Sequence, residues 1–453
     1  MIFHLDDNGA VFFNPGMGWV IHHSAISGKK DVNEPDSYEN LDNVALLSYW
    51  AALEPEEGVF AWERLDASIA KWTALGKKLQ FRISTDPMLY DGKGDGVPDW
   101  VFERYGVPCQ VVEEDGYTVR YPDYRNPVYL EKLRNFLNAL ADRYGGNPDL
   151  ETVDLRGYGA WGEWHSGFQH PTRAEHAAAL RGILDVWYDA FGGKKTLILS
   201  CSYEWMNTLH PALHAPESYE EYLAWSGFDY ALAKPGISLR RDGIGGAVKL
   251  WDARIMKDYY ASGRREPMIC EYFGGYNEKL PLGGRRGYNV EDSVEEALML
   301  HPNYMMLMWD SVDFYGKRPD LIAHGLKRMG YRLLPERVEV PDEVKAGEFF
   351  FLRHDWTNRA AGRFCGGSSL EFRLRDPEGR RWELSREDGF DAGSLGEGER
   401  RSFRTPLQVP EKAAPGECIL GLRLRGYGGQ TILLPLEGKT NDGFYPVAAL
   451  RVK

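Results

Sequence analysis

The sequence has little cysteine and no long apolar run. Its five cysteines are scattered over 453 residues without Cys-x-x-Cys spacing, so we expect neither a disulfide framework nor a zinc site. No apolar run reaches the ~20 residues that a membrane-spanning helix needs, which excludes an integral membrane protein of that kind. The N-terminal segment Met1–Asp7 has no basic region followed by an apolar stretch. It is therefore not a secretory signal, and a cytoplasmic location is expected.

Positive charge is also scarce. Lysine and arginine total 54 against 67 aspartate and glutamate residues, which gives a net charge of −13 at pH 7. A surface of this sign repels phosphate, so nucleic acids and acidic membranes are not expected as partners. Aromatic residues, in contrast, are abundant, with 14 Trp, 25 Tyr and 20 Phe. So many rings indicate that some of them line a binding site rather than fill a core.

Short apolar segments alternate with amphipathic helical patterns from about residue 17 to residue 329. Such alternation is typical of repeated β-α units and a parallel sheet. The segments with strand composition are Met17–His23, Val44–Trp50, Leu79–Ser84, Val153–Gly159, Thr196–Ser202, Tyr230–Lys234, Met268–Glu271 and Tyr304–Trp309. Eight strands are what a closed α/β barrel of the (β/α)8, or TIM, type requires. An open doubly wound sheet is the competing architecture, but no glycine-rich phosphate loop follows the first segment, and the barrel is therefore predicted.

The pattern changes near residue 336. From Pro341 onward, short alternating segments are separated by Gly, Pro, Asn and Asp turns, without a convincing helix. This is typical of a small all-β sandwich. We therefore predict two domains, a (β/α)8 catalytic barrel over residues 1–340 and a β-sandwich over residues 341–453. Basic and acidic side chains nearly balance in the second domain, so the net negative charge belongs to the barrel.

Two glutamates stand where a predicted barrel strand gives way to a loop rich in glycine and aromatic residues. Glu163 follows strand four, between Trp161 and Trp164, and Glu271 ends strand seven. The active site of such barrels lies at the carboxyl ends of the strands, and the ends of strands four and seven face each other across its mouth. Glycosidic bond cleavage needs two carboxyl groups, one as acid and one as nucleophile or base. The tryptophans predict desolvation and a raised pKa for Glu163, which suits the acid and leaves Glu271 as the nucleophile.

This pair resembles that of the large barrel clan of retaining glycoside hydrolases, whose acid/base follows strand four and whose nucleophile follows strand seven. The stretch from Ser48 to Gly76 is similar to the "W…EP…G.f.W..lD" segment after the second strand of many clan members. More narrowly, Asn14-Pro-Gly-Met-Gly-Trp19, Trp161-Gly-Glu-Trp-His165 and the closing sandwich resemble a little-characterised bacterial family of glycosidase-like proteins. The resemblance implies a retaining hydrolase that needs no cofactor.

The sequence differs from the clan at the residue before the acid/base. Most clan members carry an Asn there, which holds the sugar 2-hydroxyl, whereas this chain has Gly162. The resemblance therefore implies that the contact is missing or comes from another residue, such as His165 or Arg82. It also implies that Trp309, followed by Asp310 at the end of strand eight, forms the aromatic platform beneath the bound sugar.

Further substrate contacts are predicted at other strand ends, each with a structural alternative. The alternative is a structural salt bridge for Arg82 and Asp86, fixing of the loop for the charged residues after strand six, and packing in a loop or in the core for the aromatic residues. For the two glutamates, the alternative to catalysis is a buried ion pair with a barrel arginine such as Arg156. The candidates are Trp161, Trp164 and His165 around the acid, Arg82 and Asp86 after strand three, Tyr203 and Trp205 after strand five, Arg240, Arg241 and Asp242 after strand six, and Tyr272 after the nucleophile. The insertion Asp91–Tyr124 is predicted to build a pocket wall, with Trp100 as an outer sugar contact.

The sequence thus predicts a glycoside hydrolase that acts on the ends of a neutral oligosaccharide or on a glycoside, with retention. The main alternative is a non-catalytic carbohydrate-binding protein on a barrel scaffold, which would keep the aromatic walls. A metal-dependent hydrolase is less favoured, because His22 and His23 are adjacent and point to opposite faces of a strand. No metal or other cofactor is expected. A carboxyl separation of about 5–5.5 Å would imply retention, and one of about 6.5–9.5 Å inversion.

Overall fold

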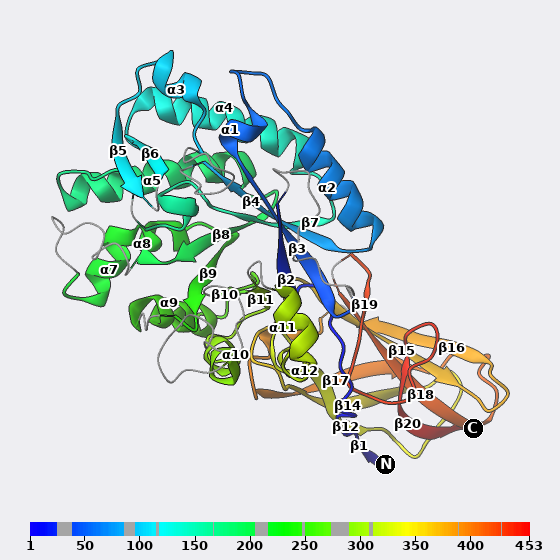
Figure 1. Cartoon of the computed structure of the whole chain (residues 1–453). Coiled ribbons are helices and arrows are strands. Elements are labelled where there is room, and N and C mark those ends of the chain that lie inside the picture. Colours follow the sequence, from blue (N-terminus) through cyan, green and yellow to red (C-terminus); the bar gives the residue numbers. More distant parts are fainter. Residues whose placement is uncertain are drawn as a thin grey trace.

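A computed structural model describes residues 1–24, 39–85, 96–114, 117–165, 167–203, 216–246, 250–272, 290–307, 311–387, 389–426 and 428–453. The chain forms a closed barrel of eight parallel strands, as the sequence predicts (Figure 1). Around the ring these are β2 (Gly18–Ser24), β3 (Leu41–Tyr49), β4 (Lys78–Ser84), β7 (Leu150–Asp154), β8 (Thr196–Cys201), β9 (Ile237–Ile244), β10 (Ile269–Tyr272) and β11 (Tyr304–Leu307), which pairs with β2. Among the described residues, no helix has the length and apolar character to cross a bilayer.

The prediction of the sixth strand is wrong. Most of Tyr230–Lys234 lies in helix α8 (Phe228–Leu232), and the sixth barrel strand is β9, Ile237–Ile244. The sequence of β9, Ile-Ser-Leu-Arg-Arg-Asp-Gly-Ile, lacks the apolar run by which the other strands are recognised. Arg240, Arg241 and Asp242 therefore lie within the sixth strand rather than after it.

The lower part of the barrel interior is apolar. Side chains from β2, β3, β8, β10 and β11 form one buried cluster there, consisting of Val20, Ala45, Leu47, Ile198, Ile269, Tyr304 and Met306. These positions alternate along each strand with residues that face the surrounding helices. The polar inward residues of the same strands collect nearer their carboxyl ends, where the candidate site lies.

The helices between the strands start at well-formed caps. Asn126 caps α4 (Pro127–Tyr144) by accepting hydrogen bonds from two backbone N–H groups, and Thr172 caps α5 (Arg173–Phe191) by accepting one from the N–H of Glu175. Both helices bury an apolar stripe in the main core. The remaining described helices of the barrel are α1 (Trp50–Leu53), α2 (Glu63–Ala74), α7 (Tyr219–Ser226), α9 (Leu250–Ala261), α10 (Val290–Leu298), α11 (Ser311–Lys317) and α12 (Pro319–Arg328).

The long insertion after β4 has secondary structure of its own. Its described part contains helix α3 (Asp99–Glu103) and a hairpin of β5 (Cys109–Glu114) and β6 (Tyr117–Pro122). Val119 and Tyr121 of the hairpin pack against Ala160 and Trp161, which belong to the loop after β7. The hairpin therefore buttresses the loop that leads to Glu163.

Trp100 in this insertion, predicted to be an outer sugar contact, belongs to the core. It is buried, its Nε1 donates a hydrogen bond to the carbonyl oxygen of Glu54 at 3.2 Å, and its ring packs edge-on against Trp50 at 5.9 Å. Trp100 is thus a core residue that anchors the insertion to α1.

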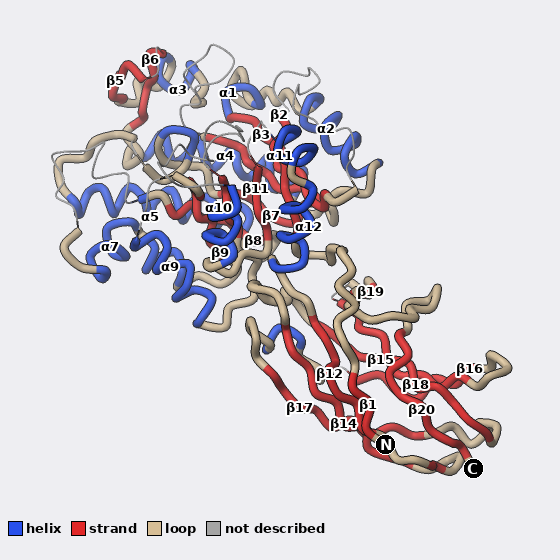
Figure 2. Tube along the Cα trace, turned by 60° about the horizontal axis from the view of Figure 1, so that its bottom comes forward, coloured by secondary structure: helices blue, strands red, loops and turns tan. Residues whose placement is uncertain are grey.

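Two sheets form the β-sandwich that follows the barrel (Figure 2). One contains β1 (Ile2–His4), β12 (Leu333–Glu339), β14 (Phe349–Asn358) and β17 (Arg400–Gln408), and the other contains β13 (Glu343–Val344), β20 (Tyr445–Val452), β18 (Gly416–Gly426), β15 (Ser368–Arg375) and β16 (Arg381–Glu387), with β19 (Thr431–Ile432) beside β18. β1 and β12 join this unit although they precede residue 341, and the division at that residue remains a prediction.

The sandwich packs against the amino ends of the barrel strands, at the end of the barrel opposite the candidate site. Asn303, just before β11, donates a hydrogen bond from Nδ2 to the carbonyl oxygen of Arg363 at 2.8 Å, and Tyr331 donates one to the carbonyl oxygen of Pro15 at 2.7 Å. A cleft of about 720 Å³ lies at this junction, lined from the barrel by Glu151 and from the sandwich by Gln430, among other residues. Its walls include none of the site residues described below.

Candidate active site

Glu163 lies in a tight turn that follows β7. The turn contains a 3-10 helix, η1 (Ala160–Gly162), and two of its bulky residues, Trp161 and Trp164, have left-handed φ angles of 55° and 67°. Such angles are rare for large side chains, and residues that adopt them cluster at functional sites. Arg156 fastens the turn, because its Nε donates a hydrogen bond to the carbonyl oxygen of Trp161 at 2.6 Å.

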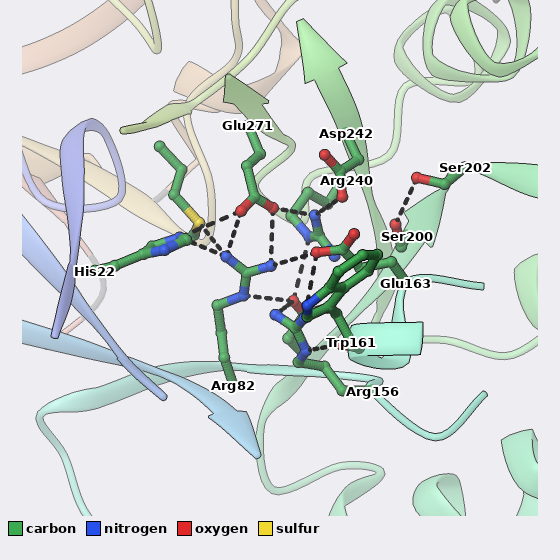
Figure 3. Close-up of polar contacts among 12 residues, drawn as sticks. His22, Arg82, Arg156, Trp161, Glu163, Ser200, Ser202, Arg240, Asp242 and Glu271 are labelled. Atoms are coloured by element: carbon green, nitrogen blue, oxygen red, sulfur yellow. Dashed lines mark hydrogen bonds and ion pairs between the residues drawn. The ribbon is translucent and has the colours of Figure 1, made fainter. Parts of the chain in front are cut away.

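Glu271 of β10 is buried and is held by three basic side chains (Figure 3). Arg82 of β4 donates to both carboxylate oxygens, at 2.6 Å to Oε1 and 2.8 Å to Oε2. Arg240 of β9 also binds Oε2, and Nε2 of His22 in β2 lies 3.2 Å from Oε1. Burial alone would raise the pKa of Glu271, but the positive charges of Arg240 and Arg82 outweigh it and lower the pKa well below the usual range. Glu271 is therefore ionised, which is the state that its predicted role as nucleophile requires.

Glu163 has a different set of basic neighbours. Its Oε1 accepts a hydrogen bond from Nη2 of Arg156 at 3.2 Å and lies 3.5 Å from Nη2 of Arg82, and its Oε2 lies 3.5 Å from Nε2 of His165. Burial raises the pKa of Glu163, but the hydrogen bond from His165 and the charge of Arg156 prevail and lower the pKa to about 2. The predicted rise in pKa is therefore wrong, because the polar contacts of this carboxylate come from basic side chains.

Three carboxylates meet at the carboxyl ends of the strands. One oxygen each from Glu163, Asp242 and Glu271 lie within 4.8 Å of one another. Carboxyl groups whose nearest oxygens lie this close are nearer to the ~5–5.5 Å spacing of retaining enzymes than to the ~6.5–9.5 Å of inverting ones. A carboxylate cluster of this kind could in principle hold a cation. Here the guanidinium groups of Arg82 and Arg240 already neutralise Glu271, so the donor set does not fit a metal ion.

Asp154, at the end of β7, lies close to all three arginines that contact the glutamates. Its Oδ2 lies 3.1 Å from Nε of Arg82, 3.2 Å from Nε of Arg240 and 3.9 Å from Nη1 of Arg156. The side chain of Asp154 is only 6% exposed. The same arginines that contact the two glutamates are thus oriented by a buried aspartate.

The two adjacent histidines of β2 point to opposite faces of the strand. His22 points into the barrel toward Glu271, whereas Nε2 of His23 lies 3.3 Å from Oγ of Ser68 in α2 and its ring packs edge-on against Trp72. This is the arrangement predicted from their adjacency. Burial and the charge of Arg82 lower the pKa of His22, so His22 is neutral at pH 7.

The structure brings only some of the predicted sugar contacts to the carboxylates. Arg82 and His165 contact Glu163, and the ring of Trp161 lies 5.9 Å from that of His165. Trp164 is fully buried and donates a hydrogen bond to the carbonyl oxygen of Ser226 at 2.9 Å. Trp164 therefore supports the turn from behind rather than facing a substrate.

Tyr203 and Tyr272 lie away from the carboxylates. Tyr203 is buried, accepts a hydrogen bond from Arg173 at 3.1 Å and contacts the ring of His176. Tyr272 stacks against Trp19 on the outer side of the barrel, because it follows the inward-facing Glu271 and neighbours in a strand point in opposite directions. Asp86, Trp205, Trp309 and Asp310 lie outside the described residues, and their roles remain predictions.

Sequence reasoning missed several residues of the site. It did not single out Asp154, gave His22 no place beside Glu271, and put Arg240 and Asp242 beyond their strand. The available signal was a charged residue at alternate positions of a barrel strand, as in Arg240-x-Asp242. In a closed barrel, charges at such spacing share the inner face and must find partners there.

Comparison with known proteins relates part of the chain to glycosidases. Residues 40–157 match a family model described as beta-galactosidase. A beta-galactosidase of Thermus thermophilus is 35% identical over 109 residues, and the beta-galactosidase BglY of Alicyclobacillus acidocaldarius is 32% identical over 116 residues; these matches cover 23% and 24% of this chain. They cover 15% of each relative, so the chain spans a small part of their length. The predicted resemblance to barrel glycoside hydrolases is thereby confirmed for a segment that contains Arg82, Asp154 and Arg156 but neither glutamate.

Two solved structures are similar over most of the chain. Endo-glycoceramidase II from Rhodococcus sp. matches over 93% of this chain and 99% of that chain, with 14% identity and a TM-score of 0.41. The endo-beta-1,4-glucanase B from Bacillus halodurans matches over 92% and 94%, with 10% identity and a TM-score of 0.40. Scores this low support no inference about the substrate.

Proposed function

We propose that this protein is a glycoside hydrolase that cleaves a neutral glycoside with retention of the anomeric configuration. The observation that carries the proposal is the approach of Glu163 and Glu271 to within 4.8 Å at the carboxyl ends of the strands of a closed barrel. Two carboxyl groups at this separation are what a double displacement needs. β-Galactosides are the first substrates to test, because the matched segment is similar to beta-galactosidases.

Glu271 has one role in this mechanism, and Glu163 has two. Glu271, kept ionised by its arginines, attacks the anomeric carbon. Glu163, whose side chain is 18% exposed against 2% for Glu271, gives its proton to the leaving oxygen. As a base it then activates the water that releases the sugar from Glu271. Neither step needs a cofactor.

The charged side chains of the site carry one unbalanced negative charge, which one proton can neutralise. Four carboxylates face three guanidinium groups: Asp154, Glu163, Asp242 and Glu271 on one side, and Arg82, Arg156 and Arg240 on the other. Since His22 is neutral, one negative charge is unbalanced. A sugar that displaces water from Glu163 penalises its charged form and raises its pKa, so the balancing proton resides there. A charged sugar would upset this balance, which favours a neutral substrate.

A panel of 4-nitrophenyl glycosides, beginning with the β-galactoside, tests the proposal. We expect turnover by the native protein and its loss in Glu271→Gln. Glu163→Gln should lose about 10²–10⁴-fold with the nitrophenyl leaving group and less with 2,4-dinitrophenyl, which leaves without protonation. Glu151→Gln, a change in β7, the strand that precedes Glu163, but at the opposite end of the barrel, serves as the matched control and should keep its turnover.

Proton NMR of the first product gives its anomeric configuration, and a short oligosaccharide separates cleavage at chain ends from internal cleavage. Retention is expected, and inversion would contradict the assignment of Glu271 as nucleophile. Unchanged turnover in both glutamine variants would end the hydrolase proposal.

Non-catalytic carbohydrate binding is the second candidate function. The observation that favours it is the low pKa of Glu163, about 2, which a resting general acid would not have. In this alternative, the ion pairs of Arg82, Arg156 and Arg240 form a rigid polar surface against which a sugar binds. Saturable binding of a sugar by calorimetry, without hydrolysis of any glycoside in the panel, would select it.

A further inference from the structure

Asp242 lies beside both glutamates, although no role in the mechanism above has been given to it (Figure 3). It stands two positions after Arg240 in β9, so both side chains point into the barrel, and Asp242 is the nearer of the two to the mouth. Nη1 of Arg240 donates a hydrogen bond to its Oδ2 at 2.8 Å. The side chain of Asp242 is 13% exposed, whereas that of Arg240 is fully buried. Arg240 therefore anchors a carboxylate that remains accessible from the site.

The position of Asp242 limits which part of a substrate it can meet. One of its oxygens lies within 4.8 Å of an oxygen of Glu163 and of Glu271. During a double displacement the anomeric carbon sits between those two carboxyl groups, so Asp242 lies alongside that carbon. The neighbours of the anomeric carbon in the ring are the ring oxygen and C2. A carboxylate accepts hydrogen bonds and cannot donate one to the ring oxygen, whereas a hydroxyl group on C2 can donate to it.

The residue before Glu163 cannot supply a contact to that hydroxyl. Gly162 has no side chain, and its φ is 67°. A Cβ added to it would lie 2.5 Å from Cβ of Arg156 and 2.6 Å from its carbonyl oxygen, so the turn excludes any larger residue here. A polar contact to the hydroxyl next to the anomeric carbon must therefore come from another element.

We propose that Asp242 accepts a hydrogen bond from the 2-hydroxyl of the sugar whose bond is cleaved, and that it makes the site selective for sugars with a free hydroxyl there. This proposal rests on the proposed hydrolase function. Hydrogen bonds to the 2-hydroxyl strengthen as positive charge develops at the anomeric carbon. The ionised carboxylate of Asp242 would thus stabilise the transition state more than the ground state, and its loss would lower kcat as well as kcat/KM.

The test compares a 4-nitrophenyl glycoside that the protein hydrolyses with its 2-deoxy analogue; with galactose these are 4-nitrophenyl β-D-galactopyranoside and the 2-deoxy form. The native protein should prefer the parent substrate by a factor that falls in Asp242→Ala. A hydrogen bond to a charged group corresponds to roughly 10- to 150-fold. We expect the loss of that factor on the parent substrate and little added loss on the 2-deoxy analogue. Asp242→Asn, which keeps an acceptor without the charge, should lie between the two.

Asp154→Asn is the matched control. Asp154 is the other aspartate that contacts Arg240, but it lies beneath the arginines. If Asp242 only held Arg240 in place, both aspartate variants would slow both substrates equally and leave their ratio at the native value, which would overturn the proposal. If the native protein hydrolyses no glycoside, the proposed function and this inference fail together, whereas an unchanged ratio in an active Asp242→Ala removes this inference alone. Circular dichroism confirms that each variant is folded.

Discussion

Arg156 contributes much of the low pKa of Glu163, and its replacement by methionine tests this assignment. Nη2 of Arg156 lies 3.2 Å from Oε1 of Glu163. At an effective dielectric constant of ~20, unit charges at that distance attract by about 5 kcal/mol, which sets the upper limit of the effect. Arg82 and His165 stay in place in the variant, so we expect the pKa of Glu163 to rise by about 1–3 pH units, the usual influence of one neighbouring opposite charge.

The pH dependence of kcat is the assay, because it reports ionisations in the enzyme–substrate complex, where the proposed mechanism places the proton on Glu163. As the proposed acid, Glu163 must be protonated in that complex, so kcat falls as the pH rises through its pKa there. Because Arg156→Met raises that pKa, the alkaline limb should move to higher pH by about 1–3 units. Arg156→Lys keeps the positive charge and should move it less.

Arg241→Met is the control for general damage. Arg241 is equally buried but follows Arg240 in β9 and so faces away from the barrel interior. Its loss should reduce stability and leave the alkaline limb where it is in the native protein. An alkaline limb that stays in place in Arg156→Met, or moves to lower pH, would refute the view that this arginine governs the ionisation of Glu163.

Two further predictions concern stability. Burial and the charge of Glu151 raise the pKa of Asp42 to about 8. The folded protein therefore keeps this proton at pH values at which the unfolded chain has lost it. As a result, the free energy of unfolding falls as the pH rises from about 4 to 8, by up to ~1.4 kcal/mol per pH unit. Urea unfolding at pH 5 and pH 8 should show a smaller decrease in Asp42→Asn, and an equal decrease would contradict the assignment. Trp100→Ala should lower the free energy of unfolding by about 3–5 kcal/mol and leave KM near its native value, since this ring is buried against Trp50; a raised KM with native stability would instead restore its role as a sugar contact.

The barrel and its pair of glutamates could be predicted because both leave a local mark on the sequence. Strands buried on both faces appear as short apolar runs, such as Val44–Leu47, and the helices between them keep their own period. A glutamate at the end of such a run, like Glu271, or in the loop that follows one, like Glu163, stands at the carboxyl end of a strand, and in a closed barrel these ends meet at one mouth. Glu163 and Glu271 could thus be placed together without knowing any contact between them.

The ionisation of that pair could not be predicted in the same way, because it depends on side chains that come from strands β2, β4 and β9 and from the loop after β7. Trp161 and Trp164 are next to Glu163 in the sequence, and neighbours in the sequence suggested an apolar wall. In the fold, Trp164 turns behind the loop, while Arg156 and Arg82 reach the carboxylate. Whether the pKa of an inward-facing carboxyl group rises or falls depends on which side chains of the other strands lie at the same height in the barrel. That height is set by the register of the strands.

Strand β9 connects the wrong prediction of the sixth strand with the wrong prediction of the pKa of Glu163. Its charged residues made the strand hard to recognise in the sequence, and the same residues set the charge of the site. An arginine and an aspartate at alternate positions interrupt the apolar run, so the nearby segment Tyr230–Lys234 passed for the sixth strand. Buried charges of this kind are tolerated only when paired, and Arg240 pairs with Asp154 of β7, Asp242 of its own strand and Glu271 of β10. Breaking one of these pairs would leave a buried charge without compensation. The charged residues of β9 therefore keep Glu271 ionised, although they interrupt the apolar pattern of the strand. An Arg-x-Asp pattern within a barrel sequence indicates a strand whose side chains contribute to the site.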